Sequence, residues 1–230
     1  NPYALDRSTC GSSSGSGAAV AAAMVRLAVG TETDGSIICP SSMNGIVGLK
    51  PTMGLVPRTH VVPISHSQDI AGPMGDNVRD VAMMFSAMIV ADPADPVTRD
   101  ADKYRHDYAA ALDAGAIRGM RVGYMKRGDQ PEWAAAFDMA LERLKSAGAI
   151  LVEVTPTSTE GMGAGESAVL HNELKDDLAA YLSTTDPAKV KTRTLSDLIA
   201  FNILHADTET PLVDRKSTRL NSSHTDISRM

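Results

Sequence analysis

The chain has 230 residues, of which 43% are hydrophobic and 22% charged, and its net charge at pH 7 is -6. This is the composition of a globular protein with one large or two small domains, and it excludes disorder throughout. The acidic balance leaves no broad basic surface for nucleic acid. No run of about eighteen apolar residues is present to span a membrane.

The cysteine count bears on the compartment. Two cysteines, Cys10 and Cys39, are too few for a disulfide scaffold and lack CxxC spacing. They therefore favour a reducing compartment, and we expect the cytoplasm. The chain begins at Asn1 without a charged segment followed by an apolar core, so a signal peptide would have to lie upstream.

The first part of the chain is rich in small residues. Gly and Ser cluster at 11–17 and again at 30–36, and such loops let backbone approach a neighbouring group closely. Ala18 to Ala28 contains strong helix formers without Gly or Pro, which predicts a helix. Residues 46–49 form a short apolar run that ends before Pro51 and predict a buried strand.

Helical periodicity begins at Asn77, which is the predicted N-cap, and continues to Ile89. Beyond it, a strand, a helix and a second strand follow in the order typical of layered α/β folds, at residues 121–125, 133–144 and 150–154.

The C-terminal third contains two further predicted helices, at residues 169–182 and 195–204. Residues 216–230 have no sustained apolar period and predict an unfolded tail. The amino-acid sequence of this tail also resembles a translation of sequencing-adapter DNA. We therefore exclude it from the predicted domain, which covers residues 1–215.

A pair of Gly-flanked serines is the most informative feature. The run GSSSGSG at 11–17 is by itself typical of a flexible linker or an anion-binding turn. It leads directly into a predicted helix, however, so its backbone amides lie at a helix N-terminus. A second such serine, Ser36 in GTETDGS, follows Ser12 after room for one helix and a return turn. The two serines can therefore meet.

Two other types of loop fit less well. Neither segment ends in the Gly-Lys-Ser/Thr of a phosphate-binding P-loop, and no GxGxxG follows a strand. The residues from Gly11 to Gly15 match the GxSxG of α/β-hydrolases, but no apolar strand precedes them and a triad would need an acid and a histidine in order.

Two long segments resemble the amidase signature family, in particular its peptide amidase-like branch: STCGSSSGSGAAVAA from Ser8, and GTETDGSIICPSSMNGIVGLKPTMGLVPRTHVVPISHSQDIAGPM ending at Met74. The resemblance is dense over residues 1–92 and continues to about Asp207 in HNELKDDLAAYL and TLSDLIAFN. It implies an α/β fold, an α/β/α sandwich around a mixed sheet, which this chain would represent incompletely at both ends.

The resemblance also implies the catalytic roles. Ser36 would be the nucleophile that forms an acyl-enzyme. Ser12, after a cis peptide bond from Gly11, would be the bridging serine that passes a proton between Ser36 and a lysine. Thr31 and Glu32 match positions that brace the second loop. The oxyanion hole would consist of the backbone N–H groups of Thr33, Asp34, Gly35 and Ser36.

The base of this family is a neutral lysine upstream of the bridging serine. Such a lysine needs its pKa lowered by about 3 units from ~10.4, through burial. Residues 1–11 contain no lysine, and Lys50 matches a structural position after the nucleophile. We therefore expect these 230 residues alone not to hydrolyse amides. The resemblance implies neither a cofactor nor a metal.

Departures from the family pattern bear on the substrate. Cys10 and Ser14 replace common glycines, and Cys39 stands where malonamide-cleaving relatives carry an arginine for a substrate carboxylate. We expect a small-molecule or peptide substrate with a neutral amide, such as a peptide C-terminal amide. The alternatives are the glutamine-hydrolysing subunit of a tRNA-dependent amidotransferase and a non-catalytic remnant.

Several other groups are given structural interpretations. His60 and His66 lack a nearby carboxylate or cysteine to complete a metal site, so we expect structural or surface histidines. Glu173, Asp176 and Asp177 predict a solvated acidic helix face. Two further serines are expected to belong to a loop, namely Ser65 and Ser67.

Overall fold

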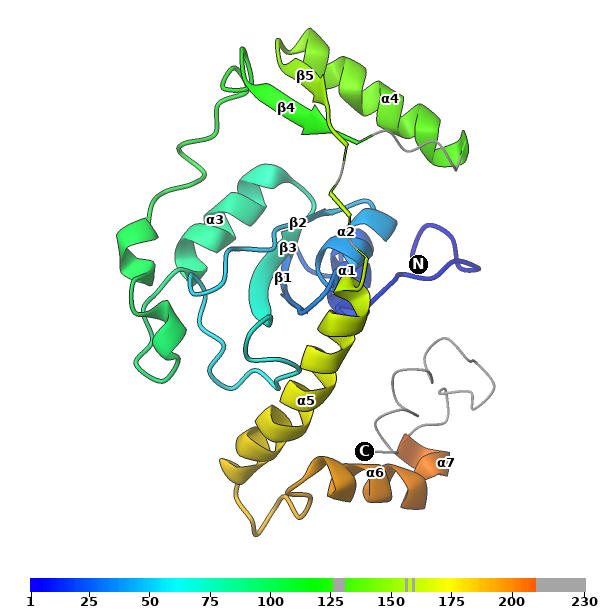
Figure 1. The fold of residues 1–230 in the computed structure, drawn as a ribbon, viewed down its shortest axis with the longest axis vertical. Coiled ribbons are helices and arrows are strands. Elements are labelled where there is room, and N and C mark those ends of the chain that lie inside the picture. Colours follow the sequence, from blue (N-terminus) through cyan, green and yellow to red (C-terminus); the bar gives the residue numbers. More distant parts are fainter. Residues whose placement is uncertain (126–130, 156, 159, 210–230) are drawn as a thin grey trace. The chain divides into compact units, whose positions relative to one another are not determined.

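The computed structural model describes residues 1–125, 131–155, 157–158 and 160–209, which form an α/β protein (Figure 1). It contains two compact units, Asn1–Ala109 together with the chain from Ala164 onward, and Ala110–Gly163. No helix within these ranges is both long and apolar enough to cross a membrane. The tail predicted at 216–230 lies outside the described residues.

A three-stranded antiparallel sheet forms the centre of the first unit. Its strands are β1 (Leu27–Glu32), β2 (Val47–Gly48) and β3 (Ile70–Gly75). β3 is the central strand, and Gly75 lies opposite both Leu27 and Val47. Every residue of β3 is buried. The short strand predicted at 46–49 is present as β2, but its two residues are only partly buried.

The helix predicted over Ala18–Ala28 is wrong in its second half. Helix α1 (Ser14–Ala21) begins inside the Gly/Ser segment, and the chain then turns and enters β1 at Leu27. Pairing of β1 with the whole of β3 outweighs the helix propensity of these residues. Figure 1 shows α1 next to this sheet.

Strand β3 and helix α2 (Ile38–Met43) had no recognisable sequence signal. β3 contains Gly72 and Pro73, which are rare inside strands. Gly72 is required by packing, since a Cβ at this position would lie 2.2 Å from the backbone oxygen of Leu49.

Helix α3 (Val78–Met88) confirms the periodicity that begins at Asn77. The Asn77 side chain accepts a hydrogen bond from the Asp80 N–H at 2.9 Å, as an N-cap should. Phe85 faces the core and packs against Tyr108 in a tilted arrangement, with ring centroids 4.9 Å apart. The buried core cluster comprises Val56, Ala71, Phe85, Ile89 and Ala101.

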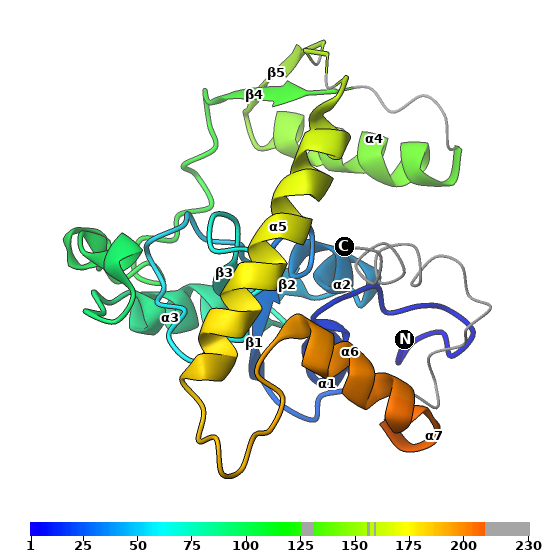
Figure 2. The ribbon, with the colours of Figure 1, turned by 60° about the horizontal axis from the view of Figure 1, so that its bottom comes forward.

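The two C-terminal helices are also confirmed. α5 (Met162–Ser183) is longer than predicted, and α6 (Leu195–Leu204) has the predicted bounds. A capping box between Thr194 and Asp197 begins α6. Figure 2 shows α6 and then α7 (Ala206–Glu209) following α5 through a loop. Two 3-10 turns lie earlier in this unit, at Pro96–Thr98 and Ala101–Tyr104.

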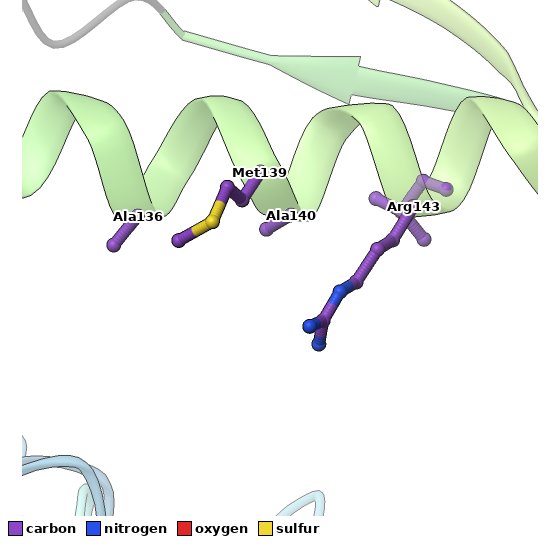
Figure 3. A pocket seen from close by; sticks show the side chains of 5 residues that line it. Ala136, Met139, Ala140 and Arg143 are labelled. Atoms are coloured by element: carbon purple, nitrogen blue, oxygen red, sulfur yellow. The ribbon is translucent and has the colours of Figure 1, made fainter.

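The second unit is the predicted strand, helix, strand element. Parallel strands β4 (Arg121–Tyr124) and β5 (Ile150–Glu153) are joined through helix α4 (Pro131–Ser146). Phe137 of α4 packs against Tyr124, with ring centroids 6.5 Å apart. The opposite side of α4 lines an open hollow of about 440 Å³ with Ala136, Met139, Ala140, Arg143 and Leu144 (Figure 3).

Candidate active site

The two serine-bearing segments lie against each other. The Ser13 N–H donates to the Ser36 backbone oxygen at 3.2 Å. The Ser13 hydroxyl both donates to the backbone oxygen of Thr31 and accepts from its N–H, each at 3.0 Å. The peptide bond between Gly11 and Ser12 is cis, as the family resemblance implies. The fold therefore brings the neighbour of Ser12 into direct contact with Ser36.

The turn formed by residues 33–36, called here the 33–36 turn, connects β1 to α2. Gly35 has φ +76°, a left-handed conformation that favours glycine. The buried carboxylate of Glu32 accepts hydrogen bonds from the N–H groups of Ile37 at 2.8 Å and Ile38 at 3.0 Å. Glu32 thus braces the turn, as the resemblance implies.

The four backbone donors of this turn are available. Within the described part of the chain, the N–H groups of Thr33, Asp34, Gly35 and Ser36 have no hydrogen-bond partner. Unpaired consecutive amides are the donors that an oxyanion requires.

A disulfide joins Cys10 to Cys39, with a Cα–Cα distance of 5.8 Å that lies in the usual range. This corrects the expectation drawn from the cysteine count, because the fold brings together two residues that are far apart in sequence. The bond connects the segment of Ser12 to the helix that follows Ser36. The cysteine count no longer favours a reducing compartment.

Lys50 does not reach the two serines. Its ammonium group donates to the backbone oxygen of Pro51 at 3.4 Å. Among residues 1–125, 131–155, 157–158 and 160–209, no lysine hydrogen-bonds to Ser12 or Ser36. The structural interpretation of Lys50 agrees with this contact.

The second side of the turn is held by Asp69, which sequence reasoning did not single out. Its side chain is buried, and one carboxylate oxygen accepts from the Thr33 hydroxyl at 2.5 Å. The other accepts from the N–H groups of Ile64 at 2.7 Å and Ser65 at 2.8 Å. The only sequence signal was its place in the family-like SHSQD motif.

The acidic face predicted on α5 is partly wrong. Asp176 is exposed as expected, but Glu173 and Asp177 bind the loop that contains Ser65 and Ser67. The ligand atoms of His66, Glu173 and Asp177 lie within 4.8 Å of one another. Carboxylates are therefore placed beside His66 after all, from a helix more than one hundred residues away. His60 takes no part in this cluster.

A cavity of about 420 Å³ lies between this loop, the turn at Asp95 and α5. Asp69, which also contacts Thr33, lines it, but Ser12 and Ser36 do not. The cavity is therefore connected to the 33–36 turn only through Asp69, and neither serine opens onto it. Its other polar lining residues include Arg58, His60, His66 and Asp177.

Comparison with known families decides the relationship. The amidase family model matches residues 1–222. The chain belongs to the amidase family. It has the amidase-signature α/β fold and lies near the peptide amidases in structure.

Among relatives of this amidase chain, a probable amidase of Arabidopsis thaliana is 37% identical over 216 residues, 91% of this chain and 41% of the relative. A glutamyl-tRNA(Gln) amidotransferase subunit of Acinetobacter baylyi is 38% identical over 188 residues, 79% of this chain and 37% of the relative. The peptide amidase of Stenotrophomonas maltophilia superposes with a TM-score of 0.84 at 42% identity, covering 90% of this chain and 42% of that enzyme. The chain thus spans about two fifths of the length of these relatives.

Proposed function

We propose that this chain carries the nucleophile and the bridging serine of a serine amidohydrolase that cleaves carbon–nitrogen amide bonds. The observation that carries the proposal is the contact of Ser13 with Ser36, immediately after the cis bond at Ser12.

The proposed reaction begins when the Ser36 hydroxyl attacks the amide carbonyl. Its proton passes through the Ser12 hydroxyl to a neutral lysine, which acts as the base. The carbonyl oxygen becomes an oxyanion and accepts hydrogen bonds from the backbone N–H groups of the 33–36 turn. The same proton returns through Ser12 to the leaving nitrogen, and an acyl-serine ester remains. Water then releases the acid by the reverse relay.

The lysine is the group that residues 1–11 do not supply. We therefore define the lysine-completed chain as this chain joined to the lysine-bearing N-terminal segment and the C-terminal segment of an amidase-family enzyme, because the chain spans only about two fifths of its relatives. The 230 residues alone are expected to be inactive, since an unassisted serine hydroxyl is a weak nucleophile at neutral pH.

A neutral amide is the substrate that best fits the chain. Position 39 is a cysteine engaged in a disulfide, so it offers no cation to a substrate carboxylate. A peptide C-terminal amide has no charge next to the bond that is cleaved. We infer that such an amide is preferred over a small dicarboxylic amide.

Glutamine hydrolysis is the second candidate, because glutamyl-tRNA(Gln) amidotransferase subunits match the chain at 38% to 44% identity. Free glutamine carries an ammonium and a carboxylate that a specific site must pair. A peptide amide carries neither charge near the reacting carbon.

The test is ammonia release by the lysine-completed chain from an acetylated dipeptide amide, malonamate and glutamine. We expect release from the peptide amide, and none from the unmodified 230-residue chain. Faster release from glutamine would favour the amidotransferase function instead. If a folded lysine-completed chain releases no ammonia from any of the three, that result contradicts the proposed function and favours a non-catalytic remnant.

A further inference from the structure

The loop of residues 64–69, called here the 64–69 loop, lies between the 33–36 turn and helix α5. The loop contacts the turn through the side chain of Asp69. Both carboxylate oxygens of Asp69 are engaged, one with the Thr33 hydroxyl at 2.5 Å and the other with the N–H groups of Ile64 and Ser65. Thr33 is thereby fixed to the loop by a buried, charged acceptor.

On the side of α5, two carboxylates one helical turn apart hold the same loop. One oxygen of Glu173 accepts from the hydroxyls of Ser65 and Ser67 and from the Ser67 N–H. Asp177 accepts from the His66 N–H at 2.7 Å. Both side chains are only 18% exposed, so this face of α5 is bound rather than solvated.

The charge of Glu173 is stabilised at this position. Hydrogen bonds from the Ser65 hydroxyl, and then from the N–H and hydroxyl of Ser67, outweigh partial burial and hold the pKa of Glu173 below its usual value. The carboxylate is therefore ionised at neutral pH, and charge-assisted hydrogen bonds are the stronger kind. Ser65, which bonds to both Asp69 and Glu173, is completely buried between them.

We propose that Glu173 and Asp177 are positioning residues, which act through the 64–69 loop, Asp69 and Thr33 to hold the backbone amides of the 33–36 turn in place. This inference rests on the proposed function for its catalytic meaning. The two acids do not touch the substrate or Ser36. They fix the backbone N–H groups that would bind an oxyanion. Donors that are misplaced stabilise the transition state much less.

The chain of contacts from α5 through the 64–69 loop to the 33–36 turn is called here the positioning relay. Amide hydrogen exchange of the full 230-residue chain tests it without requiring catalytic activity. The reporters are the N–H groups of Ile37 and Ile38, which are bonded to Glu32 at the end of the turn. In Glu173→Ala or Asp177→Ala we expect their exchange to rise on the order of tenfold. Glu173→Gln, which keeps an acceptor, should recover part of the protection.

Two controls separate the relay from a general loss of stability. Asp176→Ala removes the same charge from the exposed neighbour of Asp177 and should leave Ile37 and Ile38 unchanged. The Ile89 N–H, which caps α3 by bonding to Phe85, should exchange at an unaltered rate in every variant.

Thr33→Val cuts the link between Asp69 and the turn and leaves the loop intact. In this background Glu173→Ala should add nothing to the exchange of Ile37 and Ile38. Unchanged exchange at these amides in Glu173→Ala, an equal rise at Ile89, or an additive effect in Thr33→Val would each overturn the relay.

The effect of Glu173 on catalysis is measured separately, through kcat and KM. In the lysine-completed chain, Glu173→Ala should lower kcat about tenfold with little change in KM, because an oxyanion donor acts mainly in the transition state. A change in KM alone would contradict a positioning role. Absence of any hydrolysis would refute the proposed function and leave the exchange result standing.

Discussion

Ser36→Ala in the lysine-completed chain is expected to lower kcat about a millionfold, which is the scale seen when a serine nucleophile is removed from a hydrolase. Ser12→Ala is expected to cost less, about 10²- to 10⁴-fold, because Ser12 transfers a proton and forms no bond to carbon. The two variants therefore separate covalent catalysis from the proton relay. Ammonia release from a peptide amide measures both.

Ser14→Ala is the matched control. Ser14 belongs to the same Gly/Ser segment but has no part in the proposed chemistry, so its removal should leave kcat unchanged. If Ser12→Ala were as inactive as Ser36→Ala, proton transfer alone would not account for the role of Ser12. If Ser36→Ala retained a substantial rate, Ser36 would not be the nucleophile.

Arg58→Ala is expected to lower the free energy of unfolding by about 3 kcal/mol, since it leaves a buried carboxylate without its charged partner and with only backbone N–H donors such as that of residue 58. Arg58 bonds to Asp95 through its Nε and Nη2 atoms, each at 3.1 Å, and the two side chains are 15% and 9% exposed. Its Nη1 atom also donates to the backbone oxygens of His66 at 2.7 Å and Asp69 at 3.3 Å. Urea unfolding of the 230-residue chain measures the loss.

The loss of stability in Arg58→Ala should be smaller at acidic pH. Burial alone would raise the pKa of Asp95, but the side-chain and backbone hydrogen bonds from Arg58 outweigh it and leave the pKa below its usual value. The stabilisation by Asp95 is therefore complete above its unfolded pKa of about 3.9 and is lost as the pH falls through the lower folded value. The difference between wild type and Arg58→Ala should shrink accordingly on acidification.

Arg99→Ala is the control for a change of charge, because Arg99 and its neighbour Asp100 are both exposed. We expect little loss of stability from a surface pair of this kind. An equal loss in both variants, or a difference between wild type and Arg58→Ala that grows at low pH, would contradict a stabilising role of the Arg58–Asp95 pair.

Local patterns in the sequence predicted much of this fold. The apolar spacing and the Asn77 cap gave α3, and the strand, helix, strand order of the second unit follows from short apolar runs separated by helical periodicity. Strand β3 could not be predicted because Gly72 and Pro73 are residues that rarely occur inside strands. Strand β1 could not be predicted either, because it forms by pairing with β3, which the local sequence does not indicate. Tertiary pairing, rather than local propensity, decided both elements.

The candidate site divides in the same way. The two serine loops and the bracing Glu32 are visible in the amidase-like motifs. The Cys10–Cys39 disulfide and the bonds from α5 to the 64–69 loop depend on distances between residues far apart in the chain. An acidic residue on a helix looks the same in sequence whether it is solvated or bound, so Glu173 and Asp177 could not be distinguished from Asp176.

The most direct test of Ser36 as the nucleophile is to identify the residue that an amide-mimicking fluorophosphonate modifies in the lysine-completed chain, by mass spectrometry of its peptides. We predict one phosphonylated residue, Ser36, with slower modification in Ser12→Ala and none in Ser36→Ala. Modification of Ser12 or of another residue in place of Ser36, or no modification of the folded protein, would contradict the proposed nucleophile.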